Sequence, residues 1–421
     1  MTEARSAAYA GADQGAARLY RILGLLPSAT TAIHPAMAGA AAGLDPAATT
    51  AALDVLVARG LLNHDDGGHR FASLPARRHA AALAESTDTP ATRARAIRRA
   101  LDWLLTEATA ASRRIDPTRR TVDPPVSFPP AHRLSLFTTT QARAFLTDRG
   151  PHLTTTLTLA TTHHRAAVPY LVHACWPYYL RAGDHKVTVA HHTKALSTDT
   201  ALPPLVRREL LGARATALRA RHLFPAALED AHEALALARR DQDQVGIAQH
   251  QHDIGATLHE ADAFDLANTY LARAYQGRAA LGRHRDAAIT LLTQGVVNLD
   301  LGLHADAVKR LRTAEEVLAA HGDHYNAARA RAWQGRAAAL AGDHDRATAL
   351  LAGAMVTFRT EGGRLWQARV LAWQAEIATA REHVGRAAGL YRQSADLYQG
   401  YSLTDYDQVT DALNSLTVVA P

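Results

Sequence analysis

The sequence has little cysteine, little lysine and no long apolar run. Its single cysteine is Cys175, which excludes an internal disulfide and any metal site built from several cysteines. No apolar run approaches the roughly 18 residues of a membrane-spanning helix, so we expect no membrane partner. The first residues, Met1 to Arg5, lack the charged and then apolar segments of a secretory leader. We therefore expect a cytoplasmic protein.

Apolar residues make up 48% of the 421 positions and charged residues 20%, which indicates a globular protein of more than one domain. The net charge of +6 is small for this length. Residues 1–87 hold seven acidic and seven basic side chains, whereas residues 88–120 hold eight arginines and four acidic residues. Nucleic-acid-binding proteins concentrate positive charge on the domain that reads the bases. Here the N-terminal domain is neutral.

The second half of the chain contains an internal repeat of 40 residues. Three series of small residues keep this spacing over five units: Ala215, Gly255, Gly295, Gly335 and Ala375; Ala227, Ala267, Ala307, Ala347 and Ala387; Ala234, Ala274, Ala314, Ala354 and Ser394. Between the last two series, four units place a bulky residue, Leu271, Leu311, Leu351 or Tyr391, and the other unit has Ala231. This phase indicates a stack of repeated helical hairpins.

The order of small and bulky positions resembles the tetratricopeptide repeat. Small side chains would let the two helices of a hairpin approach closely, and the bulky side chain would fill the gap between successive hairpins. The tetratricopeptide unit has ~34 residues, so the additional residues would lengthen the helices or the turns. A degenerate sixth unit would come before the five, with Cys175 at its first small position. Residues 404–418 would form a capping helix.

The N-terminal residues predict a winged helix. The elements expected there, in chain order, are helices over 17–27, 35–43 and 47–59 and a β-hairpin of 61–64 with 69–74. Asp45 would cap the third helix and Pro46 would lie in its first turn. The tip of the hairpin would be the turn Asp65-Asp66-Gly67-Gly68.

The fold class that follows is mostly all-α, with an N-terminal winged helix before a tetratricopeptide-repeat superhelix. The expected domains are an N-terminal tail (1–16), the winged helix (17–87), a connecting helix (88–115), a Pro-rich linker (116–136), degenerate helical repeats (137–203), five 40-residue repeats (204–403) and a capping helix with a tail (404–421).

Several segments resemble one family of signal-transduction NTPases. Ala17–Pro27, Leu53–Leu62 and Arg70-Phe71 look like the winged helix that follows the NB-ARC nucleotide-binding module, above all in SARP-like antibiotic regulators. Gln141–Arg149 with Leu153 is similar to the Ala-Trp-Leu…Glu-Arg…Asn-Leu segment before the repeats of that family. The resemblance covers most of the chain from residue 17 onward and implies the C-terminal portion of such a regulator.

The nucleotide switch of that family is missing from the sequence. Phosphate-binding loops need glycines followed by lysine and Ser/Thr, and none of the three lysines, Lys186, Lys194 and Lys309, follows such a loop. The family ends its winged helix with a His-Asp pair, and the matching positions here are Ala72 and Ser73. We therefore expect no ATP hydrolysis and no cofactor.

Direct DNA binding is one alternative function. The expected third helix offers only Thr49, Thr50, Asp54 and Arg59 to a major groove, whereas base reading favours Arg, Lys, Asn and Gln. A basic cluster that could contact phosphate follows it in the connecting helix: Arg93, Arg95, Arg98 and Arg99. Our preferred interpretation of this cluster is a solvated helix face around a buried Trp103.

Catalytic and metal sites find no support in the local sequence. No His-Glu-x-x-His motif is present, and His250, His252 and His259 are not spaced one turn apart as zinc ligands on one helix would be. We expect no metal, and the sequence identifies no catalytic residue.

The inner groove of the helical stack is the remaining candidate site. First-helix positions that we expect to face it are Glu209, Arg219, Gln249, His252, Arg329, Arg336, Arg369 and Glu376. Arg329 and Arg369 occupy equivalent positions in successive repeats, and stacked guanidinium groups favour a carboxylate or an acidic peptide. The alternative is that these are ordinary surface arginines of an arginine-rich chain.

The preferred hypothesis is a non-catalytic regulator or scaffold that binds a protein or peptide segment, in signalling or transcriptional control. The first alternative is a DNA-binding regulator that uses the winged helix and the basic helix 93–99. The second alternative is a biosynthetic enzyme built on the helical-repeat scaffold.

Overall fold

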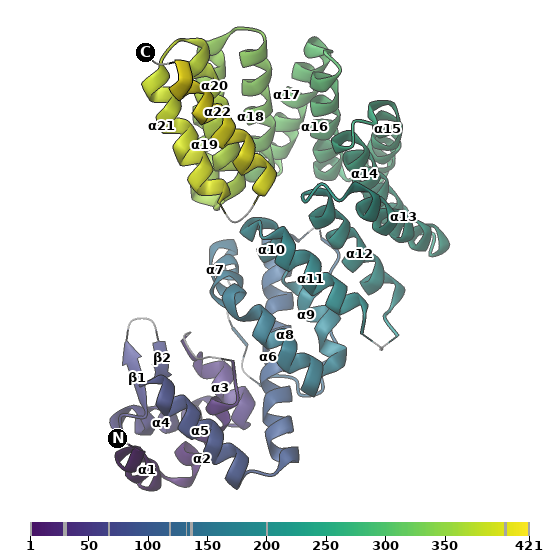
Figure 1. Ribbon diagram of the computed structural model, residues 1–421. Helices are drawn as coiled ribbons and strands as arrows, with labels where there is room; N and C mark the ends of the chain where they lie inside the picture. The colour runs from purple at the N-terminus through teal and green to yellow at the C-terminus, as the bar shows by residue number, and fades with distance from the viewer. Residues whose placement is uncertain are drawn as a thin grey trace. The chain divides into compact units, whose positions relative to one another are not determined.

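The computed structural model describes residues 2–27, 32–65, 68–117, 119–131, 133–134, 138–198, 201–399 and 402–419. The chain divides into two compact units. Unit 1 comprises Met1–Tyr178 with Thr193–Val206, and unit 2 comprises Tyr179–His192 with Arg207–Pro421. Within the described residues the chain is mostly helical, with one small two-stranded sheet (Figure 1).

The first elements are α1 (Thr2–Ala10), α2 (Gln14–Gly24), α3 (Pro35–Ala42), α4 (Pro46–Ala58), β1 (Leu62–Asp65), β2 (Gly68–Phe71), α5 (Leu74–Thr87), α6 (Pro90–Ile115), α7 (Thr139–Arg149), α8 (Leu153–His163), α9 (Val168–Ala174) and α10 (Trp176–Ala182), with 3₁₀ turns at Gly150–His152 and Arg165–Ala167. The remaining helices are α11 (His185–Leu196), α12 (Pro204–Arg219), α13 (Phe224–Arg240), α14 (Gln244–Glu260), α15 (Phe264–Ala280), α16 (His284–Asp300), α17 (His304–Ala320), α18 (His324–Leu340), α19 (His344–Glu361), α20 (Arg364–Ala380), α21 (Val384–Tyr398) and α22 (Leu403–Val419).

Side-chain caps and prolines start the N-terminal helices. Asp45 accepts a hydrogen bond from the Ala48 backbone N–H, and Pro46 follows in the first turn, as the sequence predicts. Thr89 and Pro90 start α6 in the same way. Ser73 caps α5 by accepting a hydrogen bond from the Ala76 backbone N–H.

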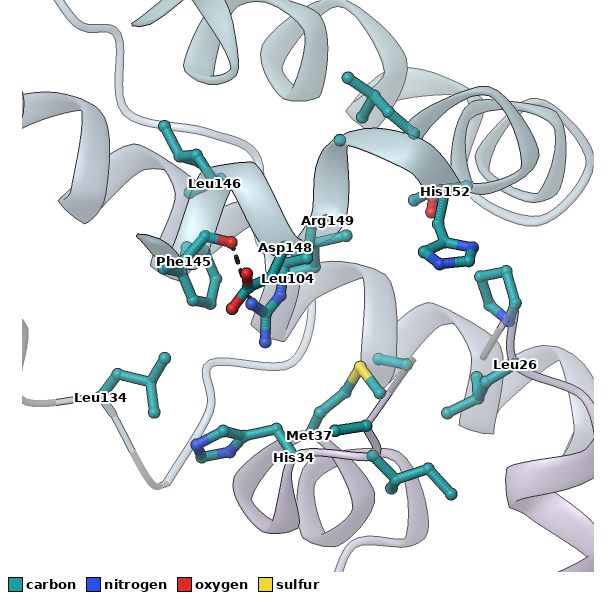
Figure 2. Close-up of a pocket in the computed structure, with 18 of the residues that line it drawn as sticks. Leu26, His34, Met37, Leu104, Leu134, Phe145, Leu146, Asp148, Arg149 and His152 are labelled. Carbon is teal, nitrogen blue, oxygen red and sulfur yellow. Dashed lines mark hydrogen bonds between the residues drawn. The ribbon is translucent and has the colours of Figure 1, made fainter. Parts of the chain in front are cut away.

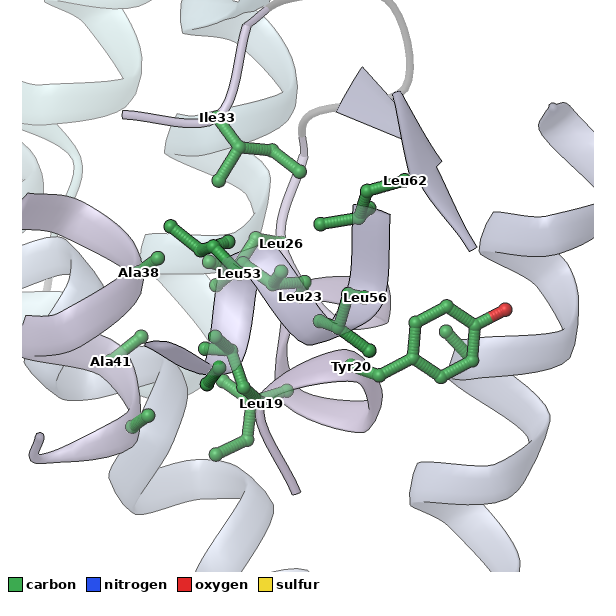
Figure 3. Packing of buried hydrophobic residues seen from close by; sticks show 14 of the residues in the cluster. Leu19, Tyr20, Leu23, Leu26, Ile33, Ala38, Ala41, Leu53, Leu56 and Leu62 are labelled. Carbon is green, nitrogen blue, oxygen red and sulfur yellow. The ribbon is translucent and has the colours of Figure 1, made fainter. Parts of the chain in front are cut away.

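A hydrophobic core joins α2, α3, α4 and the sheet (Figure 3). Leu19, Leu23, Leu53 and Leu56 are almost fully buried in it. The hydroxyl of Tyr20 donates a hydrogen bond of 2.6 Å to the Ala76 carbonyl, which ties α2 to α5. The segment that we expected to be an N-terminal tail contains α1, and the Tyr9 hydroxyl of that helix accepts a hydrogen bond from Arg21 at 2.7 Å.

The β-hairpin pairs Leu62 with Phe71 and Asp65 with Gly68 in antiparallel register. Asp66 and Gly67 of the predicted hairpin tip lie outside the described residues. An isolated bridge pairs Ile33, between α2 and α3, with His69 of β2. The small sheet therefore packs beside the three helices through Ile33 as well as through the hairpin itself.

The segment between α6 and α7 contains no helix or strand in its described residues, in agreement with its prolines. It is nevertheless fastened to α6 by two fully buried acidic side chains. Asp102 accepts the backbone N–H groups of Ser127 and Phe128 at 3.0 and 2.8 Å, and it also contacts His164 Nε2 at 2.9 Å. Glu107 accepts Arg133 Nε at 2.6 Å. The prolines therefore belong to a packed strap rather than to a free spacer.

Unit 2 contains a helical-repeat superhelix of the tetratricopeptide type. Helices α13 to α18 each span 17 residues, and turns of three residues join them, so the additional residues of the 40-residue unit lie in the helices. A left-handed residue recurs every 20 positions in the turns: His222, Gln242, Asp262, Gly282, Gly302, Gly322, Gly342, Gly362 and Glu382. The same turn conformation therefore joins each helix to the next.

The repeat's small and bulky residues meet inside each hairpin. A Cβ added to Gly255 would lie 2.7 Å from Leu271 Cγ, and one added to Gly335 would lie 2.9 Å from Leu351 Cγ. The bulky residue therefore packs against the first helix of its own hairpin, whereas we expected it to fill the gap between hairpins. At the C-terminal end, Tyr406 and Val409 of α22 pack in one cluster with Tyr391 and Tyr398, as a capping helix would.

Among the described residues, no single helix is both long enough and apolar enough to cross a membrane. The bent pair of α3 and α4, with 106° between its helices, meets those two requirements only when both are taken together.

Candidate ligand-binding groove

The first helices of the hairpins, α12, α14, α16, α18 and α20, carry every predicted groove position. Successive members of this set contact one another: α14 touches α16, α16 touches α18, and α18 touches α20. In a curved stack, the helices that come closest together lie on the inner side. The side of the stack on which these helices contact one another is therefore the candidate groove.

Two arginines of these helices converge on one tryptophan. Arg329 of α18 and Arg369 of α20 lie with their guanidinium carbons 5.1 and 5.0 Å from the centroid of the Trp366 ring. Arg329 Nη1 donates to Asn326 Oδ1 at 2.9 Å, and its Nε is buried without a hydrogen-bond partner. Among the described residues, neither arginine forms an ion pair with a carboxylate.

The surroundings disfavour the positive charge of Arg329. Burial lowers the pKa of this side chain; nearby Tyr325 acts in the opposite direction, and the like charges of Arg369 and Arg219 lower it further. Asp323 raises it, but this carboxylate is paired with Arg285 at 2.7 Å. A buried cation without a carboxylate partner is an electrostatic deficit that an anionic ligand would relieve.

Aromatic rings surround the two arginines. Trp333 and Trp373 are separated by 4.8 Å between ring centroids, and Trp366 lies 6.3 and 6.4 Å from them. Phe358 stacks on Trp366 at 5.5 Å. We name Arg329, Arg369, Trp333, Trp366 and Trp373 the arginine–tryptophan cluster. Trp373 is buried in the core of the last repeats, and Trp333 and Trp366 are half-buried beside it. The cluster therefore combines two partly exposed rings with positive charge, and Trp and Arg are residue types that dominate binding hot spots.

Sequence reasoning placed the arginines but missed the tryptophans and Tyr325. Trp333 and Trp373 are themselves 40 residues apart, so the repeat phase that identifies Arg329 and Arg369 also relates these rings. Arg181 of α10 lies 5.7 Å from the Tyr325 ring and brings a further positive charge to the cluster. No signal in the sequence relates position 181 to position 325.

At two of the predicted positions, the side chains carry opposite charges and pair with each other. Arg336 forms a hydrogen-bonded ion pair with Glu376, which stands one repeat further along the chain. Arg336 also lies 5.8 Å from the Trp373 ring. This pair borders the arginine–tryptophan cluster and contributes no net charge to it.

Arg219, Gln249 and His252, three other predicted positions, belong to a polar network on α12 and α14. Arg219 pairs with Glu260 at 3.2 Å. Gln249 accepts a hydrogen bond from the buried Arg278 at 2.6 Å and donates one to Asp253 at 2.9 Å. Arg278 of α15 is a contributor that sequence reasoning missed, because it belongs to a second helix.

His252 is a member of this network with an unsatisfied polar atom. Its Nδ1 atom is buried without a hydrogen-bond partner. Burial lowers its pKa well below the ordinary value, and the charges of Arg278, Arg219 and Arg329 act in the same direction. The imidazole is therefore neutral near pH 7. The shared influence of these arginines brings Arg219, His252 and Arg329 into one electrostatic environment.

The predicted basic cluster on α6 is largely occupied by contacts within the protein. Arg93 Nη1 donates to the carbonyls of Ala84 and Glu85 at the end of α5, at 3.3 and 3.2 Å. Arg98 contacts the His163 carbonyl at 3.3 Å, and Arg99 lies 5.2 Å from the Phe128 ring. Arg95 is exposed. Trp103, one turn beyond Arg99 in the same helix, is fully buried.

No group of three or more His, Cys, Asp or Glu side chains with metal-ligand geometry occurs within the described residues. His250 pairs with Asp253, and His259 pairs with Asp300. Cys175 lies at the break between α9 and α10, and burial raises its pKa to about 12, so its thiol is protonated and a poor nucleophile at neutral pH.

Comparisons with known proteins define the fold. No protein-family model matches the chain, and no curated protein matches it. Two solved structures share its fold with TM-scores of 0.51 and 12% identity. One is a Rap protein complexed with competence and sporulation factor, which matches 76% of this chain and 98% of that chain. The other is NprR in complex with its cognate peptide NprX, which matches 60% of this chain and 74% of that chain.

A signal transduction ATPase with numerous domains and a tetratricopeptide repeat sensor, from Pyrococcus horikoshii, is also similar. It matches 98% of this chain and 64% of that chain at 11% identity, with a TM-score of 0.47. At these identities, the matches with TM-scores of 0.51 establish a helical-repeat fold of the tetratricopeptide type.

Proposed function

We propose that this chain is a non-catalytic regulator whose inner groove binds a peptide or protein segment that carries carboxylates. The observation that carries the proposal is the arginine–tryptophan cluster, in which Arg329 and Arg369 share the Trp366 ring and neither has a carboxylate partner in the described chain. A carboxylate there would form charge-assisted hydrogen bonds, and the adjacent rings would pack on the apolar part of the ligand.

The solved structures of similar fold support a peptide as the ligand. The Rap protein is complexed with competence and sporulation factor, and NprR is in complex with its cognate peptide. Both proteins share the helical-repeat fold of this chain. For this chain, the positive charge of the cluster selects an acidic sequence.

We propose that residues 17–87 form a winged helix that serves as a docking surface in a SARP-like regulator without a nucleotide switch. Helices α2, α3 and α4 followed by the β-hairpin have the required order, and the bridge between Ile33 and His69 supplies a third, minimal strand. The contacts of Arg93 and Arg98 with backbone carbonyls favour docking over DNA binding. A cytoplasmic location fits this role.

The groove is tested with short peptides. A displayed library of eight-residue peptides rich in Asp and Glu is selected against the purified chain, and the best sequence is labelled with fluorescein for anisotropy titration. We expect the double variant Arg329→Gln/Arg369→Gln to weaken binding by at least about tenfold, since each lost charge-assisted hydrogen bond is worth roughly 1.5–3 kcal/mol.

A matched control removes the same charges elsewhere. Arg346 and Arg386 are also 40 residues apart, but they lie exposed on the second helices α19 and α21. Arg346→Gln/Arg386→Gln should leave the affinity within about twofold, because exposed charges are screened by salt. Equal losses in both double variants, or no selection of acidic peptides over their amide counterparts, would falsify the proposal.

A further inference from the structure

A cavity lies within unit 1, between the residues that follow α2, the start of α3, and helices α6, α7 and α8 (Figure 2). Its volume is about 740 Å³, within the range of small-molecule sites, which is roughly 300–1,000 Å³. Most of its wall is apolar and includes Leu26, Met37, Leu104, Leu134, Phe145 and Leu146. It is separate from the arginine–tryptophan cluster, all of whose residues belong to unit 2.

One guanidinium group projects into this apolar cavity. Arg149, at the end of α7, points toward the side where Met37 and His34 lie (Figure 2). Its Nη1 donates to the Phe145 carbonyl at 3.0 Å, and its guanidinium lies 3.8 Å from the Phe145 ring centroid. Within the described chain it forms no ion pair with a carboxylate. Burial lowers its pKa to about 10.

The other titratable groups around Arg149 leave it the main charge in the cavity. Asp148 borders the cavity and favours the charged form of Arg149, but its side chain is exposed and makes no ion pair with it. Burial and then the charge of Arg149 lower the pKa of His34, which is neutral near pH 7. The pKa of Cys175 is raised to about 12, so its thiol is neutral as well. Arg70 and His152 also line the cavity, and Arg70 contacts Asp65 at 3.5 Å. The buried Glu107 favours the charged form of Arg149 but is paired with Arg133.

We propose that this cavity binds a small amphipathic carboxylate, with its apolar body against the leucines and Phe145 and its carboxylate on Arg149. A guanidinium accepts one carboxylate in a two-pronged hydrogen-bonded pair. A doubly charged phosphate would bring a second negative charge, which Arg149 alone would not balance and which Asp148 would repel. The ligand would contact the N-terminal core through Leu26 and Met37 and the later helices through Leu104 and Arg149, so its binding would stabilise unit 1 as a whole.

The test uses isothermal titration calorimetry of the full chain with sodium dodecanoate, below its micelle concentration. Dodecanol, dodecyl phosphate and dodecyltrimethylammonium are the comparison probes. We expect one dodecanoate per chain, at least tenfold weaker binding of the alcohol and the phosphate, and no binding of the cation. Equal binding of dodecanoate and the cation, or no dodecanoate binding at 1 mM, overturns the proposal.

Two substitutions assign the site. Arg149→Met keeps the length and apolar contacts of the side chain and should weaken dodecanoate binding at least tenfold, with unchanged circular dichroism. Asp148→Asn removes a repelling charge from the rim and should tighten binding a few-fold. Arg95→Met, on the exposed face of α6, is the control and should change nothing. If Arg149→Met does not fold, an unchanged affinity in Asp148→Asn is sufficient to reject the site.

The reactivity of the cysteine measures directly whether the cavity is occupied. Cys175 is the one cysteine of the chain and lines this cavity. Its reaction with 4,4′-dithiodipyridine should slow when dodecanoate is bound. A calorimetric signal without any slowing would place the ligand elsewhere and reject the cavity as its site.

Discussion

Leu311 occupies the space that a side chain on Gly295 would need. A Cβ at Gly295 would lie 2.8 Å from Leu311 Cγ and 3.3 Å from the Ala307 carbonyl oxygen. Leu311 is fully buried, so it has no free volume into which to move. The missing side chain at Gly295 therefore sets the distance between the two helices of that hairpin.

Replacing Gly295 by alanine should destabilise the chain. Alanine favours the helix by about 1 kcal/mol over glycine, but overpacking a full core costs about 1–3 kcal/mol. We expect a net loss of about 1 kcal/mol in the free energy of unfolding, measured by urea denaturation. The control is Gly389→Ala in α21, where a Cβ would meet nothing within 4 Å and propensity alone should raise stability. Shifts of the same sign in both variants would contradict this packing argument.

The turns between the helices offer a second matched pair of variants. Gln242 has a left-handed φ of 54°, and Gly302 occupies the equivalent kind of turn at 73°. The left-handed conformation costs a non-glycine residue about 1–2 kcal/mol, and the greater unfolded-state freedom of glycine offsets about 0.4–1 kcal/mol. Gln242→Gly should therefore raise the urea midpoint slightly, and Gly302→Ala should lower it. A lower midpoint for Gln242→Gly would show that its side chain makes compensating contacts.

Asp102 should be the most sensitive acidic residue of unit 1. Asp102→Ala would leave the N–H groups of Ser127 and Phe128 unpaired, together with His164, so we expect a loss of about 3 kcal/mol or more. Limited proteolysis should also cut residues 119–131 faster. Asp123→Ala removes a carboxylate that is 88% exposed and should cost no more than about 1 kcal/mol. Similar losses of stability in both variants would contradict the conclusion that Asp102 holds the segment after α6 against that helix.

The stability of unit 2 should fall as the pH drops below about 6.5. The folded-state pKa of His252 is well below its ordinary value, so folding favours the neutral imidazole. The resulting stability is fully present above the unfolded pKa and is lost as the pH falls toward the folded pKa. His252→Gln should flatten the profile of the unfolding midpoint between pH 7.5 and 5, whereas His304→Gln, at an exposed position, should not. Parallel profiles for the two variants would refute this role of His252.

The repeat could be predicted from the sequence because every hairpin has the same packing requirement. Each hairpin needs a small residue opposite a bulky one, so Gly255 with Leu271 and Gly335 with Leu351 recur at one spacing that is visible in the letters alone. The helix start at Asp45 follows from local hydrogen bonding to the first turn. These features depend on residues that are near in the sequence or equivalent in phase.

The charges at the site could not be assigned in this way. Arg329, Arg336 and Arg369 look alike in the sequence, yet Arg336 meets Glu376 while the other two share Trp366. Which arginine is neutralised depends on side chains that the superhelix brings together from different repeats. The same holds for Arg149, whose apolar surroundings come from distant segments.

The sequence by itself determined the helical class, the 40-residue repeat and the small positions that hold each hairpin together, because local periodicity and close packing fix them. Only the tertiary structure decided which arginines lack a carboxylate and where the cavity of unit 1 lies. An ion pair or a cavity wall requires atoms within a few ångströms of one another, and that proximity is created by folding between residues far apart in the chain.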